Sequence, residues 1–155
     1  MKISDILTED FVVVGLDVSS KEDAINALVE LISKSEKVKN VNKVREAVFE
    51  REKIMTTGVG KGFAVPHGKT DAVTDIVAAF AITKKPIDYD SLDGEPVRLI
   101  FLLVGRDNMV GPHIKLLSRI SKLMNDNNFR ERLLNAKDSK EVVELFKTEE
   151  EKYLG

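Results

Sequence analysis

The chain contains no cysteine and no long apolar run, and neither sign of charge dominates it. The absence of cysteine excludes disulfides, thiolate metal sites and cysteine nucleophiles, and it fits a cytoplasmic location. No segment approaches the roughly 18 consecutive apolar residues of a membrane span. The first ten residues, MKISDILTED, also lack the basic and apolar regions of a secretory signal. We therefore expect a soluble, unprocessed protein that does not insert into a membrane.

The charge balance argues against nucleic acid as a partner. The 24 basic and 26 acidic residues give a net charge of -2, and no segment concentrates lysine and arginine. A chain of 155 residues with 43% hydrophobic content is of a size to form a single domain with one sizeable core. We expect one domain over residues 1–155, with its core at about residues 3–147. The closing KTEEEKYLG is highly charged and is predicted to be a solvated helix end or a frayed tail.

Strand and helix patterns alternate along the chain. Short apolar β-branched runs predict strands, and apolar residues spaced three and four apart predict helices. The run VRLIFLLV is continuous, as expected for a strand buried on both faces. Ser19 and Glu22 have the spacing of a capping box at the start of the first helix. The expected strands are 11–14, 62–66, 75–83 and 97–104, and the expected helices are 19–37, 42–53, 112–125, 129–134 and 139–146. This order indicates a layered α/β domain with helices covering a sheet.

The glycine-rich stretch GVGKGFAVPHGKT (58–70) invites a nucleotide-binding interpretation, which its spacing does not support. A P-loop needs four residues between its glycines, whereas five separate Gly62 from Gly68. The dinucleotide fingerprint needs a third glycine where Phe63 stands, and a strand where a helix is predicted. A permissive turn after a helix explains Gly58, Gly60 and Gly62 equally well.

His67 is the most informative residue of this stretch. Pro66 biases the residue before it towards an extended conformation, and Gly68 allows a sharp turn beside the imidazole. A lone histidine is more often structural, so a functional role requires partners elsewhere in the chain.

Arg51 and His113 are the two candidate partners. Arg51 continues the apolar stripe of the predicted helix 42–53, so its guanidinium must reach water, pair with a carboxylate or bind an anion. His113 follows Pro112 in the first turn of a predicted helix and also begins an apolar stripe. The dipole of that helix favours an anion and disfavours an imidazolium, although a half-buried capping histidine fits as well.

These residues favour histidine as a nucleophile towards a phosphoryl group. Two histidines without an H-E-x-x-H motif disfavour metal-dependent hydrolysis, and no G-x-S-x-G elbow is present. A neutral imidazole can attack phosphorus, and an arginine and a second histidine can stabilise the product by charge-assisted hydrogen bonds worth about 1.5–3 kcal/mol each. No metal or other cofactor is expected.

The segments EREKIMTTGVGKGFAVPHGK (50–69) and GPHIKLLSRIS (111–121) resemble the fructose/mannitol type of enzyme IIA of the phosphoenolpyruvate-dependent sugar phosphotransferase system. The resemblance covers about residues 3–146. It implies a mixed β-sheet between helices, phosphorylation at His67, and stabilisation of the phosphoryl group by Arg51 and His113. Val65 stands where isoleucine is common, a change that we expect to be harmless.

The resemblance also implies partners. Phosphorylated histidine phosphocarrier protein would donate to His67, and a cysteine of an enzyme IIB would accept before the sugar is phosphorylated during uptake through the membrane enzyme IIC. Because this chain has no cysteine, we expect a stand-alone IIA. Docking requires an accessible, largely apolar rim around His67, for which Met55, Phe63 and Met109 are candidates.

Two alternatives stay open. The same family includes regulatory IIA-like proteins linked to nitrogen metabolism, in which phosphorylation controls binding to target proteins. The third possibility is an anion-binding domain in which His67 forms no covalent bond.

Overall fold

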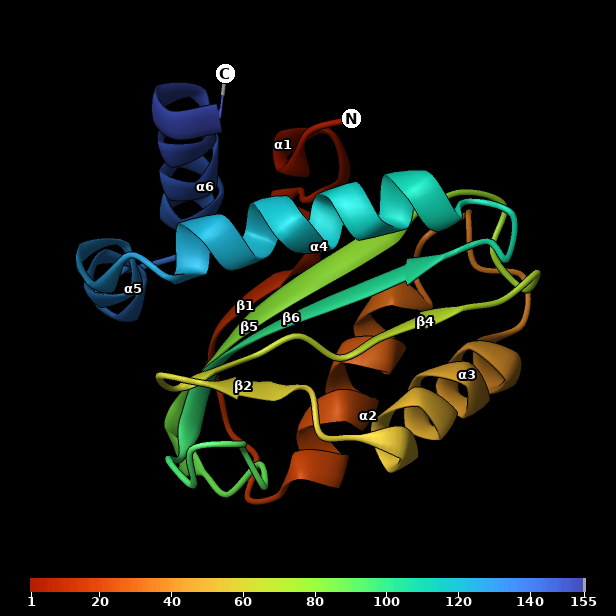
Figure 1. Cartoon of the computed structure of the whole chain (residues 1–155), viewed down its shortest axis with the longest axis horizontal. Helices are drawn as coiled ribbons and strands as arrows, with labels where there is room; N and C mark the ends of the chain where they lie inside the picture. Colours follow the sequence, from red (N-terminus) through yellow and green to blue (C-terminus); the bar gives the residue numbers. More distant parts are fainter. Residues whose placement is uncertain (155) are drawn as a thin grey trace.

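A mixed β-sheet with helices on both faces forms the centre of the protein, which we describe over residues 1–154 in a computed structural model (Figure 1). The strands are β1 (Val12–Leu16), β2 (Gly58–Gly60), β3 (Phe63–Ala64), β4 (His67–Lys69), β5 (Val77–Ile87) and β6 (Val97–Gly105). The helices are α1 (Ile3–Ile6), α2 (Lys21–Ile32), α3 (Val41–Ile54), α4 (Val110–Met124), α5 (Asn127–Leu134) and α6 (Ser139–Leu154), with a 3-10 turn η1 (Glu9–Phe11). The predicted fold class, an α/β domain with a mixed sheet between helices, is confirmed.

The sheet mixes parallel and antiparallel pairs. Its order is β1-β5-β6-β3-β2, and β4 also pairs with β6. The two long strands β5 and β6 are antiparallel neighbours, whereas β1 runs parallel to β5, and both β3 and β4 run parallel to β6. The short strands β3 and β4 therefore follow one another along the same side of β6, separated by Val65 and Pro66.

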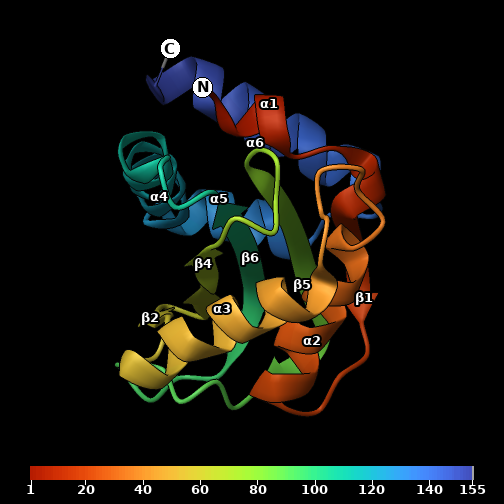
Figure 2. The same ribbon diagram turned by 90° about the vertical axis from the view of Figure 1, so that its right-hand side faces the viewer.

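Side chains on β5 and β6 alternate between two apolar cores. Phe80 and Phe101 face the layer formed by α1, α4, α5 and α6, whereas Ala79 and Leu102 face the layer formed by α2 and α3. Figure 2 shows α4 on one side of the sheet and α2 and α3 on the other. Because successive strand residues point to opposite faces, a strand covered on both sides must be apolar throughout. The prediction that the run 97–104 is buried on both faces is confirmed.

The predicted start of the first helix is wrong by one residue. Ser20 rather than Ser19 is the N-cap of α2, and its hydroxyl accepts a hydrogen bond from the amide of Asp23 at 3.1 Å. Both serines are followed three residues later by an acidic side chain, so the sequence pattern fits either position. Ser20 takes the role because it is the residue with an extended backbone directly before the first helical turn.

The charged carboxyl-terminal segment is a helix end that is only partly solvated. The exposed residues are Lys147, Thr148, Glu151, Lys152 and Tyr153, as predicted, but two acidic residues between them are buried. Helix α6 continues to Leu154, and Glu149 and Glu150 are only 2% and 1% exposed. Glu149 pairs with Arg132 at 2.8 Å. Glu150 accepts from the amides of α1 and from Arg119 on α4. Acidic residues are usually solvated, but here tertiary packing supplies the cations and N–H groups that permit their burial.

None of the helices in the described part of the chain combines the length and apolar composition that a membrane span requires.

We predict that Glu150→Ala destabilises the fold by about 3–5 kcal/mol, the usual cost of removing one partner of a buried ion pair. The Glu150 carboxylate accepts from the amides of Ile3 at 2.7 Å and Ser4 at 3.1 Å, and from Nε of Arg119 at 3.0 Å. The variant leaves these donors without their acceptor. Urea denaturation measures the effect, with Glu151→Ala as the control because Glu151 is exposed on the same helix. Equal midpoints for the two variants would contradict the buried role of Glu150.

Candidate active site

The pairing of β4 with β6 determines which way His67 faces. In the parallel register, His67 lies beside Leu103 and Gly68 beside Val104. Leu103 belongs to the core under α4, and Val104 belongs to the core under α3. Residues that lie side by side on adjacent strands point to the same face of the sheet. His67 therefore faces the α4 side and Gly68 faces the α3 side.

Gly68 allows α3 to approach the edge strand closely. A Cβ atom on this residue would lie 3.1 Å from the amide nitrogen of Val48 and 3.2 Å from the carbonyl carbon of Ala47. These are backbone atoms of α3, so any larger residue would push the helix away from β4. The close approach brings the last turns of α3, which carry Arg51, to the edge of the sheet where His67 lies.

His113 lies on the buried face of α4, opposite His67. Its ring centroid is 5.6 Å from that of His67, and the residue is only 3% exposed. Gly105 provides the necessary space, because a Cβ atom there would lie 3.2 Å from Nδ1 of His113. Among the described residues 1–154, neither ring nitrogen of His113 has a hydrogen-bond partner. An unpartnered polar group that is this deeply buried is costly unless a ligand supplies a partner.

The three residues predicted from the sequence meet in one cavity of about 380 Å³. Arg51 enters it from α3, His67 from β4 and His113 from α4. The rest of the lining is Ala47, Gly68, Lys69, Asp107, Ile114 and Leu117. The sequence therefore predicted correctly that these side chains are neighbours. Their chemical roles stay predictions.

Arg51 lacks the carboxylate partner that one sequence-based alternative predicted. Its Nη1 donates to the backbone carbonyl of Met55 at 2.8 Å, and within residues 1–154 no acidic side chain lies within ion-pair distance of it. The side chain is half-buried, so its charge stays partly solvated. Its remaining N–H donors are free of protein carboxylates and can bind an anion.

Lys69 is a cavity residue that the sequence analysis missed. Residues two apart on a strand share a face, so Lys69 lies on the same side of β4 as His67. This signal was present in the sequence, but a strand of three residues is too short to be recognised by its pattern. Lys69 adds a second positive charge to a site that already contains Arg51.

The hydrogen bond made by His67 determines its tautomer. Nδ1 lies 2.9 Å from the carbonyl oxygen of Val65. A carbonyl oxygen can only accept, so we assign the proton to Nδ1 and the lone pair to Nε2. Burial lowers the pKa of His67 below its ordinary 6.5, with the charges of Arg51 and Lys69 acting in the same direction. The hydrogen bond to Val65 and the charge of Glu52 oppose this shift. At neutral pH the imidazole is therefore uncharged, with its lone pair on Nε2.

His113 is held neutral more strongly. Burial, together with the smaller effects of positive charge on His67 and Lys69, lowers its pKa to about 4. The site thus combines two neutral imidazoles with two cationic side chains, and the acidic lining residue Asp107 lies beyond ion-pair distance of Arg51.

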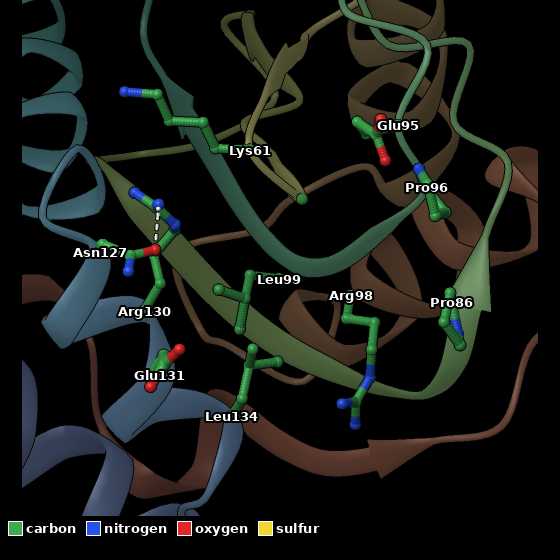
Figure 3. Close-up of a pocket in the computed structure, with 11 residues that line it drawn as sticks. Lys61, Pro86, Glu95, Pro96, Arg98, Leu99, Asn127, Arg130, Glu131 and Leu134 are labelled. Atoms are coloured by element: carbon green, nitrogen blue, oxygen red, sulfur yellow. Dashed lines mark hydrogen bonds between the residues drawn. The ribbon is translucent and has the colours of Figure 1, made fainter.

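A second cavity, of about 440 Å³, lies between α5 and the start of β6 (Figure 3). It contains Arg98 and Arg130, but both guanidinium groups already bind protein oxygens. Arg98 donates twice to the carbonyl of Thr83, and Arg130 donates to the carbonyl of Met124 and to Asn127. Neither histidine lines this cavity. We therefore place the candidate active site in the smaller cavity.

The three candidate rim residues occupy different environments. Met55 is 56% exposed, but Phe63 is buried and Met109 packs partly against the core. Phe63 was thus a wrong candidate, because β3 turns its side chain into the core beneath α4. Ile114, which lines the cavity, is exposed and apolar. The docking role of this rim stays a prediction.

Comparison with known families identifies the class of protein. The family described as "Phosphoenolpyruvate-dependent sugar phosphotransferase system, EIIA 2" matches residues 5–149. The chain belongs to this family, and this membership makes it a phosphoryl-transfer component of the phosphotransferase system.

Relatives of two kinds are similar to the chain. The "Nitrogen regulatory protein" of Bradyrhizobium diazoefficiens is 35% identical over 94% of both chains. The "PTS system fructose-specific EIIA component" of Haloferax volcanii is 36% identical over 81% of both chains. The "PTS system fructose-specific EIIABC component" of Bacillus subtilis is 32% identical over 94% of this chain, which spans only 23% of that relative.

Solved structures show the same two kinds. IIA-Ntr from Neisseria meningitidis superposes with a TM-score of 0.88 at 33% identity, covering 93% of this chain and 98% of that one. The enzyme IIA of the Escherichia coli mannitol system, solved in complex with phosphorylated enzyme IIB, superposes with a TM-score of 0.79 at 25% identity, covering 92% and 97% of the two chains.

We predict that the imidazole of His113 titrates at about pH 4, and that of His67 below 6.5, in the folded protein. In the unfolded chain, both histidines have the ordinary pKa of about 6.5 and become protonated as the pH falls below it. Because the unfolded chain then binds more protons, these two residues make the fold less stable as the pH falls from about 6.5 towards 4. Histidine NMR titration measures both midpoints, and His113→Asn assigns the signals. A midpoint near 6.5 for His113 would contradict its buried, unpartnered position.

Proposed function

We propose that the protein is a phosphocarrier that accepts a phosphoryl group on Nε2 of His67 and passes it to a second protein. The observation that supports this most directly is the bond between Nδ1 of His67 and the Val65 carbonyl, which leaves a lone pair on Nε2. The donor is phosphorylated histidine phosphocarrier protein. The acceptor is a cysteine of an enzyme IIB, which serves a membrane enzyme IIC.

Acceptance of the phosphoryl group is a displacement at phosphorus. The lone pair of Nε2 forms the new N–P bond while the P–N bond of the donor phosphohistidine breaks, and the donor imidazole keeps that electron pair. The proton on Nδ1 of His67 stays in place and spreads the positive charge that develops on the ring. The lowered pKa of His67 helps this step, because the neutral nucleophile persists at neutral pH.

Arg51 and His113 stabilise the transferred group. The free donors of Arg51 bind phosphoryl oxygens, and the half-buried position strengthens this attraction relative to bulk water. A phosphoryl group beside His113 provides the hydrogen-bond partner that its ring lacks. The new negative charge also raises the pKa of His113 from about 4, which favours its imidazolium as a donor.

Release follows the same path in reverse. A cysteine thiolate of the acceptor attacks phosphorus, the P–Nε2 bond breaks, and His67 regains its lone pair. The acceptor must lie outside these 155 residues, which contain no cysteine. The relay needs no metal or other cofactor, because its steps use only histidine, cysteine and the binding groups already named.

A regulatory role is the second candidate function. It is supported by the similarity to nitrogen regulatory proteins of Bradyrhizobium and Neisseria over nearly the whole chain. The fructose-specific relatives support the transport role to a comparable degree. Both functions use phosphorylation of His67, and they differ in what the phosphorylated protein meets next.

We predict that His67→Ala abolishes phosphate incorporation and leaves the fold intact, because His67 is half-exposed at a sheet edge. Intact-protein mass measures the reaction after incubation with phosphoenolpyruvate, enzyme I and the histidine phosphocarrier. The wild-type protein should gain one phosphoryl group that is lost in acid and kept in base. With active donor proteins, an unphosphorylated wild-type chain would leave only the non-covalent anion-binding alternative.

We predict that Arg51→Ala slows phosphoryl transfer by roughly 10- to 100-fold, corresponding to one charge-assisted hydrogen bond of about 1.5–3 kcal/mol. Rapid-quench kinetics with labelled donor measures the rate. Arg45→Ala is the matched control, because Arg45 lies on the same helix but bonds to Asn26, Asn42 and Glu30 away from the cavity. A wild-type rate for Arg51→Ala would remove Arg51 from the site.

A phosphoryl-transfer experiment with an enzyme IIB as acceptor distinguishes the transport function from the regulatory function. Purified phosphorylated protein is mixed with a fructose-type enzyme IIB and, separately, with the same IIB lacking its cysteine. Loss of phosphate to the intact IIB alone supports transport. Retention on His67 with active IIB supports regulation. Neighbouring genes for IIB and IIC would favour transport independently.

A further inference from the structure

Glu52, the residue after Arg51, is a buried carboxylate with an unusually complete set of partners. It is 8% exposed, and it forms an ion pair with Lys21 on α2 at 2.8 Å. It also accepts from the amide of Thr57 at 2.8 Å and from the Thr57 hydroxyl at 2.5 Å. Tyr89 lies beside this group, with its hydroxyl 3.1 Å from that of Thr57. Burial and the Glu52 charge raise the pKa of Tyr89, so its hydroxyl stays protonated.

Hydrogen bonds linked through the backbone of Thr57 and Val65 connect this carboxylate to the proposed nucleophile. Glu52 accepts from the amide of Thr57, and the carbonyl of Thr57 accepts from the amide of Val65 at 3.0 Å. The carbonyl of Val65 then accepts from Nδ1 of His67 at 2.9 Å. The amide and the carbonyl of Thr57 belong to different peptide groups on either side of its Cα atom, and the same is true of Val65. The hydrogen bonds are therefore linked through the backbone positions of these two residues. By holding Thr57 in place, the carboxylate thus fixes the position of Val65, whose carbonyl accepts from Nδ1 of His67.

The same carboxylate also supports the segment that orients Arg51. The guanidinium of Arg51 donates to the carbonyl of Met55, in the turn between α3 and β2. Two residues later, Thr57 is held to Glu52 through both its amide and its hydroxyl. The turn that carries the Met55 carbonyl is thus tied back to the helix on which Arg51 lies.

We propose that Glu52 is a positioning residue for phosphoryl transfer, which acts on His67 through Thr57 and Val65 and on Arg51 through the turn at Met55. This inference rests on the proposed function of His67. Glu52 itself does not line the cavity and touches no reacting atom. Its role is to keep the proton of His67 on Nδ1, so that the lone pair on Nε2 faces the donor, and to hold the Arg51 guanidinium in place.

A purely structural role for Glu52 makes a different prediction. Loss of a buried carboxylate would then lower stability without changing the tautomer of His67 or the rate constant of the folded protein. Positioning instead changes the share of the Nδ1–H tautomer, which can be measured in the unphosphorylated protein. It also lowers kcat more than it changes the KM for the donor, because docking of the donor does not involve Glu52.

The test compares Glu52→Ala, Glu52→Gln and Val44→Ala. Val44→Ala is the stability control, because Val44 is a fully buried core residue of the same helix and takes no part in the hydrogen-bond chain. Imidazole ¹⁵N NMR measures the tautomers of His67, and donor-dependent kinetics measures kcat and KM. All measurements are made at a temperature where thermal unfolding shows each variant to be folded.

We expect Glu52→Ala to reduce the Nδ1–H share of His67 and to lower kcat at least roughly tenfold, as loss of an orienting group does in other sites. The donor KM should change by less than about threefold. Glu52→Gln keeps an oxygen that accepts from Thr57, so both its tautomer share and its kcat should lie between those of wild type and Glu52→Ala.

Two results would overturn the inference. One is a folded Glu52→Ala, or Glu52→Gln if the alanine variant does not fold, with wild-type tautomer share and kcat. The other is Val44→Ala reproducing the losses of the Glu52 variants. Failure of the proposed function is distinguishable, because the wild-type protein would then gain no phosphate while the tautomer measurement would still respond to Glu52.

Discussion

The parallel pairing of β4 with β6 is the constraint on which the candidate active site depends. It places His67 beside Leu103 and therefore on the side of the sheet covered by α4. The amide of Leu103 donates to the carbonyl of Pro66, which continues the ladder across the break between β3 and β4. A slip of one residue would turn His67 towards α3 and away from His113.

The site contains polar groups whose burial without partners is unfavourable but which can bind an anion. His113 is buried without a partner in the described chain, and Arg51 has no carboxylate beside it there. Both costs are reduced when a phosphoryl group occupies the cavity, since its oxygens accept from both side chains. The edge position of β4 makes this possible, because helices from opposite faces of the sheet meet only at its edge. The arrangement therefore suits a bound anion.

The longer elements of the fold were predictable because each extends over enough residues for its apolar pattern to be recognised. The apolar run of β6 and the stripe of α4 are examples, and both lie within a few residues of their predicted bounds. Strands β2 and β4 have three residues each, too few for an alternating pattern to stand out. The burial of Glu149 and Glu150 near the end of α6 was missed for a different reason. Composition predicts solvation, whereas Arg119 and Arg132, distant in sequence, make burial possible.

The candidate site, like the fold, was only partly predictable from the sequence. Residue types and local spacing were sufficient to single out His67, Arg51 and His113, because histidine beside proline and glycine, and charged groups on apolar stripes, are local features of the sequence. Only the tertiary structure determined that all three line one cavity, that Lys69 joins them, and that Glu52 connects to His67 through Thr57 and Val65. These relations depend on strand register and on the close approach of α3 at Gly68. Both arise from packing between segments that are far apart in the chain, and local sequence patterns do not determine which distant segments pack together.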